Sequence, residues 1–205
     1  MTVRAVRSVG PNAVALELAT PAGFAALPGQ FVLVRATVDG EEIARHYTLS
    51  SPTVGETFEV TVGIDPDGDL SPWLADLNAG DELDVEGPFG DVDYDDDGDV
   101  VVFAGGPGVG PAIGIAERAR ERGHAAAVVY RDDAPIHEDR LATLSAGGAD
   151  VTVLGDDASL DAAVARVVND GGIYVFGFRE FVDDALAAVE AAGGDPDAAD
   201  VESFG

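Results

Sequence analysis

The pattern of apolar and polar residues divides the chain near residue 95. Before that point, short runs alternate apolar and polar positions between glycine and proline punctuation: VALELAT (14–20), QFVLVRATV (30–38) and TFEVTVGI (57–64). This period-two alternation is typical of strands with one buried face, so it predicts an antiparallel barrel or sandwich. One helix fits in this half, in SPWLADL, with Ser71 at its N-cap and Pro72 as its first helical residue.

The second half alternates continuous apolar runs with helical segments. The apolar runs are VVVFAG (100–105), AAAVVY (125–130), VTVL (151–154) and IYVFG (173–177). The expected helices are 111–122, 138–146, 159–168 and 179–192. Repeated strand–helix order predicts a parallel sheet covered by helices. We therefore expect two domains, residues 1–94 and 99–205, with the acidic segment 91–99 as the linker between them.

Acidity is the most unusual bulk property of the sequence. Thirty-nine Asp and Glu residues stand against 11 basic residues, all of them arginine, for a formal net charge of −28. Such a surface repels nucleic acids and anionic lipids, so neither is expected as a partner. Apart from DVDYDDDGD (91–99) the carboxylates are dispersed. Dispersed acidity favours adaptation to a salt-rich medium over a docking face for a basic partner.

Several classes of site and location are excluded by what the sequence lacks. It has no cysteine, which excludes disulfides, thiolate metal sites and a thiolate-held iron–sulfur cluster on this chain. Its three histidines show no metal-binding spacing, so no metal is expected. No run approaches the roughly 20 apolar residues that span a bilayer, and the N-terminus lacks the apolar core of a signal peptide. These features predict an unexported, cytoplasmic protein.

Three segments are suited to an anionic ligand. IARHYTLSSP (43–52) places a cation, an aromatic ring and hydroxyls in one extended run, although an ordinary amphipathic strand can have the same composition. GDLSPWL (68–74) enters a helix whose first amides are free to face a phosphate. AGGPGVGP (104–111) leads from a buried strand into a helix through glycines that allow close approach of a ligand. It lacks the P-loop lysine and the G-x-G-x-x-G register, so a tight turn is the alternative.

In their order, these segments resemble the ferredoxin-NADP reductase family, in which a flavin-binding barrel precedes a pyridine-nucleotide domain. RHYTLSS is similar to the family's R-x-Y-[ST]-x-x-S motif, GDLS to its G-x-x-S turn and AGGPGVGP to its G-G-x-G-x-x-P loop. GDELDVEGPFG (80–90) resembles the segment that closes the barrel, and ESFG (202–205) resembles the family's E-x-[FY] ending. The five matches cover almost the whole chain.

The resemblance implies FAD and NAD(P)H as cofactors and a role for particular residues. Thr48, near flavin N5, and Glu202, over the isoalloxazine ring, are the implied catalytic residues. Arg45 would pair with the flavin pyrophosphate, and Tyr47 would pack against the flavin. The other implied cofactor-binding residues are Ser51, Gly68, Leu70, Ser71, Gly105, Gly106, Gly108, Gly110, Pro111, Arg131, Gly177 and Phe204.

Two residues depart from the family pattern. Phe176 stands where the family usually has a cysteine beside the nicotinamide, and Pro107 replaces a hydroxyl residue in the glycine loop. A phenyl group at 176 could stack on the nicotinamide or block it. The leading hypothesis is an NAD(P)H-dependent flavoprotein that passes electrons to a separate acceptor such as ferredoxin. The alternatives are a flavin-carrying electron-transfer subunit without productive nicotinamide binding, and a flavin-free structural domain.

The residues after the second and third strands of the second half bear on the choice of nucleotide. Asp132, Asp133, Asp156 and Asp157 surround a single cation, Arg131. The 2′-phosphate of NADPH adds negative charge that selective sites usually meet with cations, whereas a carboxylate suits the free ribose hydroxyl of NADH. We therefore expect NADH to serve at least as well as NADPH, although Arg131 alone could rescue NADPH.

Overall fold

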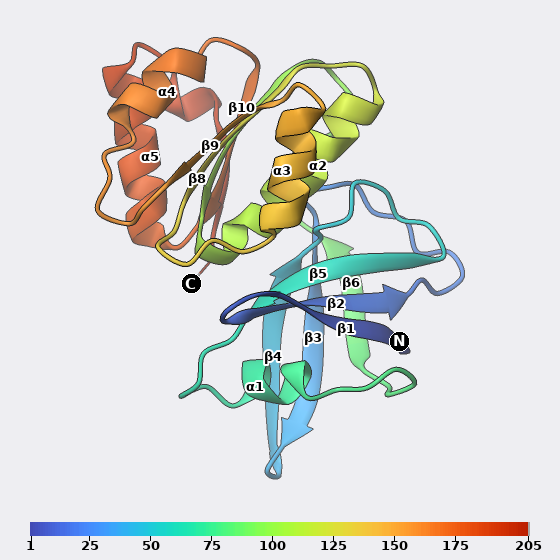
Figure 1. The fold of residues 1–205 in the computed structure, drawn as a ribbon. Helices are drawn as coiled ribbons and strands as arrows, with labels where there is room; N and C mark the ends of the chain where they lie inside the picture. The colour runs from blue at the N-terminus through green and yellow to red at the C-terminus, as the bar shows by residue number, and fades with distance from the viewer. Residues whose placement is uncertain (205) are drawn as a thin grey trace.

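The first part of the chain folds into antiparallel sheets (Figure 1). The structure is a computed structural model that describes residues 1–204, so the final glycine of ESFG and of the expected second domain lies outside it. The elements of the first part are β1 (Val3–Gly10), β2 (Ala13–Ala19), β3 (Phe31–Val38), β4 (Glu41–Thr48), β5 (Thr57–Gly63), α1 (Leu70–Ala75) and β6 (Asp84–Phe89).

Two three-stranded sheets, in the orders β1-β2-β5 and β4-β3-β6, enclose the core of this part. Isolated bridges from Thr2 to Glu82 and from Leu49 to Val60 connect the edges of the two sheets and close a barrel. Because side chains alternate along each strand, the apolar positions of the sequence pattern point inward. The buried residues include Leu16, Leu18, Val32, Val34, Phe58 and Val62.

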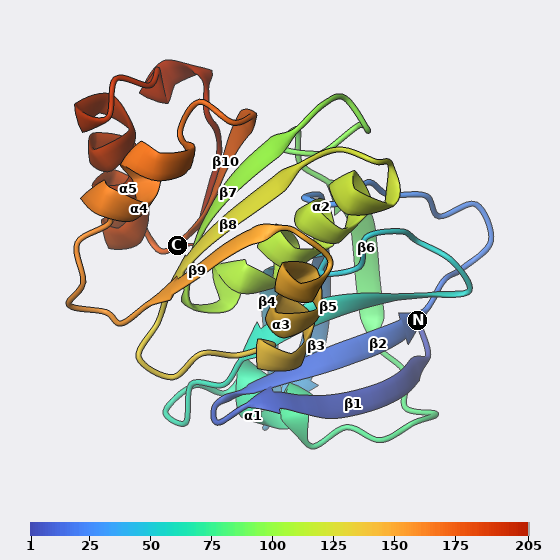
Figure 2. The same ribbon diagram turned by 45° about the horizontal axis from the view of Figure 1, so that its top comes forward.

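The second part is a parallel sheet in the order β11-β10-β7-β8-β9. Its strands are β7 (Val100–Gly105), β8 (Ala126–Arg131), β9 (Asp150–Leu154), β10 (Gly172–Gly177) and β11 (Asp200–Ser203). Its helices are η1 (Gly106–Gly108), α2 (Val109–Glu121), α3 (Glu138–Ala146), α4 (Asp161–Val167), α5 (Arg179–Ala191) and η2 (Pro196–Ala198). Helices α2 and α3 cover one face and α4 and α5 the other (Figure 2). The predicted fold class, an antiparallel barrel followed by a parallel sheet with helices, is confirmed.

The short helix of the barrel domain begins earlier than the sequence predicts. Asp69 is at the N-cap and Leu70 is the first helical residue, so Ser71 lies inside the first turn. The Ser71 hydroxyl instead accepts a hydrogen bond of 3.0 Å from the Asp65 amide. The predicted cap at Ser71 was wrong because serine can equally use its hydroxyl to hold the preceding loop.

The acidic segment 91–99 connects the two parts and is anchored on the second. Tyr94 is fully buried in the core between the sheet and α2, and its ring meets Tyr174 edge-on at 6.4 Å between centroids. Asp96 forms ion pairs with Arg118 and Arg122 of the helical layer. The segment is therefore fastened by an aromatic side chain and by charge.

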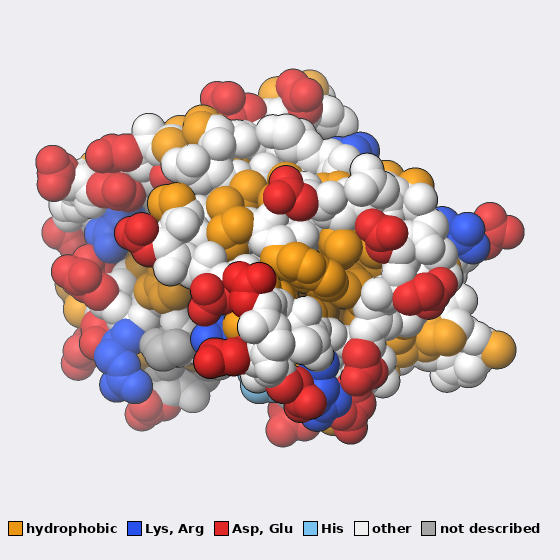
Figure 3. Space-filling model, turned by 90° about the horizontal axis from the view of Figure 1, so that it is seen from below, with side chains coloured by type: hydrophobic (Ala, Val, Ile, Leu, Met, Phe, Trp, Pro, Cys, Tyr) orange, Lys and Arg blue, Asp and Glu red, His pale blue; other side chains and the backbone are white. Residues whose placement is uncertain are grey.

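Acidic side chains are spread over the molecular surface. On the face shown in Figure 3, they lie scattered around apolar areas and along much of the outline. This distribution matches the dispersed acidity of the sequence. None of the helices within residues 1–204 has the length and apolar character needed to cross a membrane.

Candidate functional site

The two residues implied as catalytic meet where the barrel touches the last strand of the parallel sheet. Thr48 ends β4, Glu202 lies in β11, and the Thr48 hydroxyl donates a hydrogen bond of 2.9 Å to Glu202 Oε1. Burial raises the pKa of Glu202 to about 7, and the bond from Thr48 works in the opposite direction. The pair therefore places a carboxyl that can hold or release a proton near neutral pH at the junction of the domains.

An aromatic pair lies at the carboxyl end of β10. The Phe204 amide donates to the Gly177 carbonyl at 2.9 Å, and the Phe204 ring meets Phe178 edge-on at 6.1 Å between centroids. Phe178 is 57% exposed, an unusual exposure for a phenylalanine. The sequence resemblance assigns a role to Phe204 and none to Phe178. The available signal was its position directly after Gly177.

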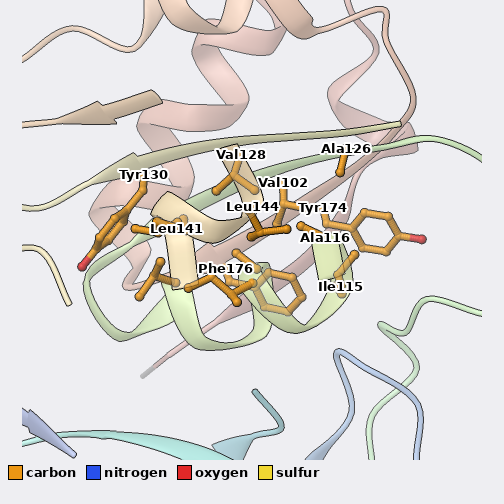
Figure 4. Close-up of a cluster of buried hydrophobic side chains, with 14 of the residues drawn as sticks. Val102, Ile115, Ala116, Ala126, Val128, Tyr130, Leu141, Leu144, Tyr174 and Phe176 are labelled. Atoms are coloured by element: carbon orange, nitrogen blue, oxygen red, sulfur yellow. The ribbon is translucent and has the colours of Figure 1, made fainter. Parts of the chain in front are cut away.

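Phe176, which replaces the family's cysteine, points into the core of the second domain. Its side chain is fully buried in the cluster that contains Val102, Ile115 and Tyr174 (Figure 4). A Cβ atom on Gly108 would collide with the Phe176 carbonyl, so the glycine loop packs directly against this residue. An enclosed phenyl neither stacks on a ligand at the surface nor blocks one, contrary to both expectations from the sequence.

The glycines around the loop after β7 have two different structural roles. Gly106 has a φ of +54°, and within the described residues no atom lies within 4 Å of a Cβ placed there. Gly105 and Gly177 face the Phe181 ring so closely that a Cβ on either would collide with it. Gly106 therefore presents open backbone to a ligand, whereas the other two allow tight packing beneath the loop.

Gly110 and Pro111 lie in the first turn of α2 and are both buried. A Cβ on Gly110 would stand 2.5 Å from Thr61 Oγ1 of the barrel. The structure thus places Gly110 in the contact between the two domains.

Arg45 keeps an exposed guanidinium beside a protonated phenol. Its Nη1 donates to the Ala44 carbonyl at 2.8 Å, and within residues 1–204 it has no carboxylate partner. Tyr47 packs partly against the barrel core, and burial raises its pKa to about 12, so its hydroxyl remains a donor at neutral pH. An unpaired cation beside an aromatic ring fits the phosphate and the flat ring of a flavin nucleotide.

The turn that the resemblance assigns to the pyrophosphate is acidic. The Gly68 amide already donates to the Asp65 carbonyl at 3.0 Å, and Asp67 and Asp69 flank Gly68. Leu70, at the helix start, is buried. Three carboxylates in this turn oppose an anionic ligand, which leaves Arg45 as the better phosphate contact.

The Ser51 hydroxyl of the same motif is engaged inside the barrel domain. It accepts a hydrogen bond of 2.7 Å from the Glu59 amide. This bond joins the segment after β4 to β5. The structure therefore shows for Ser51 a role in holding the motif's backbone.

Residues 1–94 match the family described as the oxidoreductase FAD-binding domain. The barrel part of the chain is therefore similar to the FAD-binding domain of oxidoreductases. The glycine betaine monooxygenase reductase subunit of Chromohalobacter salexigens is 45% identical over 93 residues, which are 43% of this chain and 25% of that relative. The alignment thus spans about a quarter of the relative's length.

Two solved structures share the fold of this chain over nearly its whole length. The FAD/NAD-binding domain of nitric oxide dioxygenase from Vibrio cholerae superposes with a TM-score of 0.84 at 22% identity, covering 100% of this chain and 97% of that one. The cytochrome P450 reductase of Amycolatopsis superposes with a TM-score of 0.83 at 25% identity, covering 99% and 68%. The chain therefore has the same overall fold as these two proteins.

The predicted nucleotide contact Arg131 is already paired within the chain. Its Nη2 lies 2.9 Å from Asp184 Oδ2, its guanidinium stands 5.1 Å from the centroid of the Phe181 ring, and its side chain is 14% exposed. At the end of the next strand, burial raises the pKa of Asp156, and nearby carboxylates including Asp133 raise it further. The edge of the sheet at β8 and β9 therefore carries uncompensated negative charge.

Proposed function

We propose that the protein is an NAD(P)H-dependent flavoprotein reductase that transfers hydride to bound FAD and then passes electrons to a separate acceptor, such as ferredoxin or an oxygenase component. The contact between Thr48 and Glu202 carries this proposal, because it joins the flavin motif of the barrel to the edge of the nucleotide sheet. FAD, when bound, supplies the redox chemistry, and the protein supplies binding and orientation.

The side chains around this contact have separable tasks. Arg45 neutralises a flavin phosphate with a charge-assisted hydrogen bond. Tyr47 gives the flavin an apolar surface while its phenol stays protonated. Thr48 holds its hydroxyl proton toward Glu202, whose carboxyl, with a pKa of about 7, can give or take a proton at Oε1.

The order of the parallel sheet supports a nucleotide site at the glycine loop. Strand β7 lies between β8 and β10, so the connections after β7 and β10 leave the sheet on opposite faces. Ligands of open parallel sheets bind outside the carboxyl ends of the strands at such a switch point. The open backbone of Gly106 and the exposed ring of Phe178 both lie at this end.

The alternatives from the sequence lose their support. The flavin carrier without productive nicotinamide binding rested on a phenyl group in the nicotinamide site, and the Phe176 side chain is enclosed in the core. A flavin-free structural domain gives no reason for an exposed cation, an aromatic ring and a hydroxyl to stand together at the end of β4, as Arg45, Tyr47 and Thr48 do. As for location, the dispersed acidity suits a salt-accumulating cytoplasm, and we include that compartment in the proposal.

Cofactor analysis and anaerobic reduction test the proposal. The protein, purified in molar KCl, is expected to be yellow, to release FAD on denaturation and to bleach on addition of NADH or NADPH without oxygen. Arg45→Ala should lose most of the FAD, while Arg4→Ala, which removes another exposed arginine of the barrel, should retain it. A colourless protein that takes up no FAD, or bound FAD that neither nucleotide reduces, would overturn the proposal.

A further inference from the structure

The two domains meet with their backbones in close approach. Gly110 of α2 lies so near Thr61 of β5 that a Cβ would stand 2.5 Å from the threonine hydroxyl. One turn later, a Cβ on Gly114 would stand 3.2 Å from the Ser50 and Ser51 carbonyl oxygens. Helices α2 and α3 therefore rest directly on the barrel, as Figure 2 shows.

The guanidinium of Arg140 crosses this contact. Arg140, in α3, donates to the Ser50 carbonyl at 2.7 Å and to Glu59 Oε1 at 3.1 Å, both in the barrel domain. From its own domain, Glu117 of α2 holds the same group through two hydrogen bonds of 2.9 and 2.7 Å. A planar guanidinium has donors pointing in several fixed directions, so it can join three partners in one geometry.

These charges are shielded from solvent. The Arg140 side chain is 25% exposed, and those of Glu59 and Glu117 are 12% and 24% exposed. Salt screens ion pairs of this kind much less than it screens pairs at the surface. We call Arg140, Glu117, Glu59 and the Ser50 carbonyl the interdomain clamp.

The barrel end of the clamp belongs to the flavin motif. Ser50 is two residues after Thr48 and is fully buried. Its amide donates to the Glu59 carbonyl at 2.8 Å, and its hydroxyl donates to Glu59 Oε1 at 3.2 Å. Arg140 therefore holds, from the nucleotide domain, the backbone that directly follows the flavin strand.

A second contact beside the clamp comes from His137, which precedes α3. Its Nε2 lies 2.8 Å from Thr61 Oγ1, and its amide donates to the Val9 carbonyl at 2.7 Å. Burial and, to a smaller extent, the charges of Arg140 and Arg7 together lower the pKa of His137 to about 3. The ring is therefore neutral at physiological pH and does not repel Arg140.

We propose that Arg140 is a positioning residue: the interdomain clamp sets the angle between the flavin and nucleotide domains, and thereby the approach of the two rings that exchange hydride. This inference rests on the proposed function. Helix α3 follows the loop after β8, so the clamp ties the edge of the nucleotide sheet to the flavin strand. Hydride transfer depends steeply on this geometry, because a misplacement of about 1 Å can cost on the order of a hundredfold in rate.

Three variants of the holoprotein test the proposal by rate. Arg140→Met should keep its FAD and its affinity for NAD⁺ within about twofold, yet reduce its flavin on the order of tenfold or more slowly. Arg140→Lys, which restores a cation without the planar fork, should recover part of the rate. Arg120→Met is the matched control, since Arg120 bonds the His124 and Gly147 carbonyls inside the nucleotide domain. Its rate should be unchanged.

A distance measurement tests the clamp without using activity. The sequence has no cysteine, so spin labels at Glu41→Cys in the barrel and Glu190→Cys in α5 report the interdomain distance alone. The distribution should be narrow with Arg140 and broad or shifted in Arg140→Met. An unchanged distribution, or a flavin reduction rate unchanged by Arg140→Met, would overturn the proposal.

The two measurements also separate failure of the clamp from failure of the proposed function. If the parent protein shows no flavin reduction, the proposed function fails, and the spin-label distances still test whether Arg140 holds the two domains at a fixed distance. If Arg140→Met does not fold, Arg140→Lys is carried through both measurements and judged by the same criteria.

Discussion

Replacing Glu202 by glutamine should stabilise the folded protein above neutral pH. Burial raises the pKa of this carboxyl from 4.5 to about 7 in the folded chain, whereas the unfolded chain titrates at the ordinary value. Between these two values the folded state keeps a proton that the unfolded state releases. The free energy of unfolding therefore falls as the pH rises through this window, and the loss is complete above about pH 7.

The size of the effect follows from the width of that window. A pKa shift of one unit corresponds to about 1.4 kcal/mol, so the whole shift of the Glu202 pKa corresponds to about 3 kcal/mol. Glu202 is only partly buried, and solvent screening reduces the expected gain to about 1–3 kcal/mol. Glutamine keeps an Oε1 acceptor for the Thr48 hydroxyl, so the variant removes the charge while leaving the 2.9 Å hydrogen bond possible.

Urea unfolding followed through Trp73, the single tryptophan, measures the effect at about pH 5 and pH 8 in the same concentration of KCl. The free energy of unfolding of Glu202→Gln should exceed that of the parent by about 1–3 kcal/mol at the higher pH and by less than about 1 kcal/mol at the lower pH. Glu56→Gln removes the same charge from an exposed loop position and should change stability by less than about 0.5 kcal/mol at both. An equal gain at both pH values, or a loss at the higher one, would refute the assignment of a costly buried charge to Glu202.

Three further predictions concern the whole surface, the nucleotide and the connecting segment. The melting midpoint should rise with KCl because salt screens repulsion across a net charge of −28, and an equal or lower midpoint in molar KCl would contradict this. NADH should reduce the flavin faster than NADPH because Asp184 neutralises Arg131. In stopped-flow assays, Asp184→Asn should lower the ratio of the NADH rate to the NADPH rate, whereas Asp183→Asn should leave it unchanged. Equal effects of the two variants would show that Arg131 does not set this ratio. Tyr94→Ala should lower the free energy of unfolding by about 3 kcal/mol, because it leaves a cavity at a fully buried site. A loss below about 1 kcal/mol in urea titration would mean that this ring does not anchor segment 91–99.

Local sequence patterns determined the fold class because strand and helix periods are local properties. The alternation in residues 14–20, 30–38 and 57–64 coincides with β2, β3 and β5, and the pattern at 138–146 coincides with α3. The four-residue β11 had no such signal. It is a strand because β10 supplies a partner for it, and pairing of that kind is decided by the assembled sheet.

The sequence predicted which residues belong to the candidate site but not how they contact one another. Motif resemblance named Thr48 and Glu202, but their hydrogen bond across 154 residues and the raised pKa of Glu202 arise from burial at the junction of two domains. Whether Phe176 faces a ligand or the core depends on which helices cover that side of β10. A motif does not contain that information.

The interdomain contacts of Arg140 and His137, and the pairing of Arg131 with Asp184, were decided by tertiary structure alone. Arg140 resembles any charged residue on an exposed helix face until α3 is laid on the barrel, and Arg131 resembles a free cation until α5 brings Asp184 beside it. Side-chain identity sets which interactions a residue is capable of making. The distances that select among them come from packing elements that are remote in the chain, and electrostatic and hydrogen-bond energies depend on those distances.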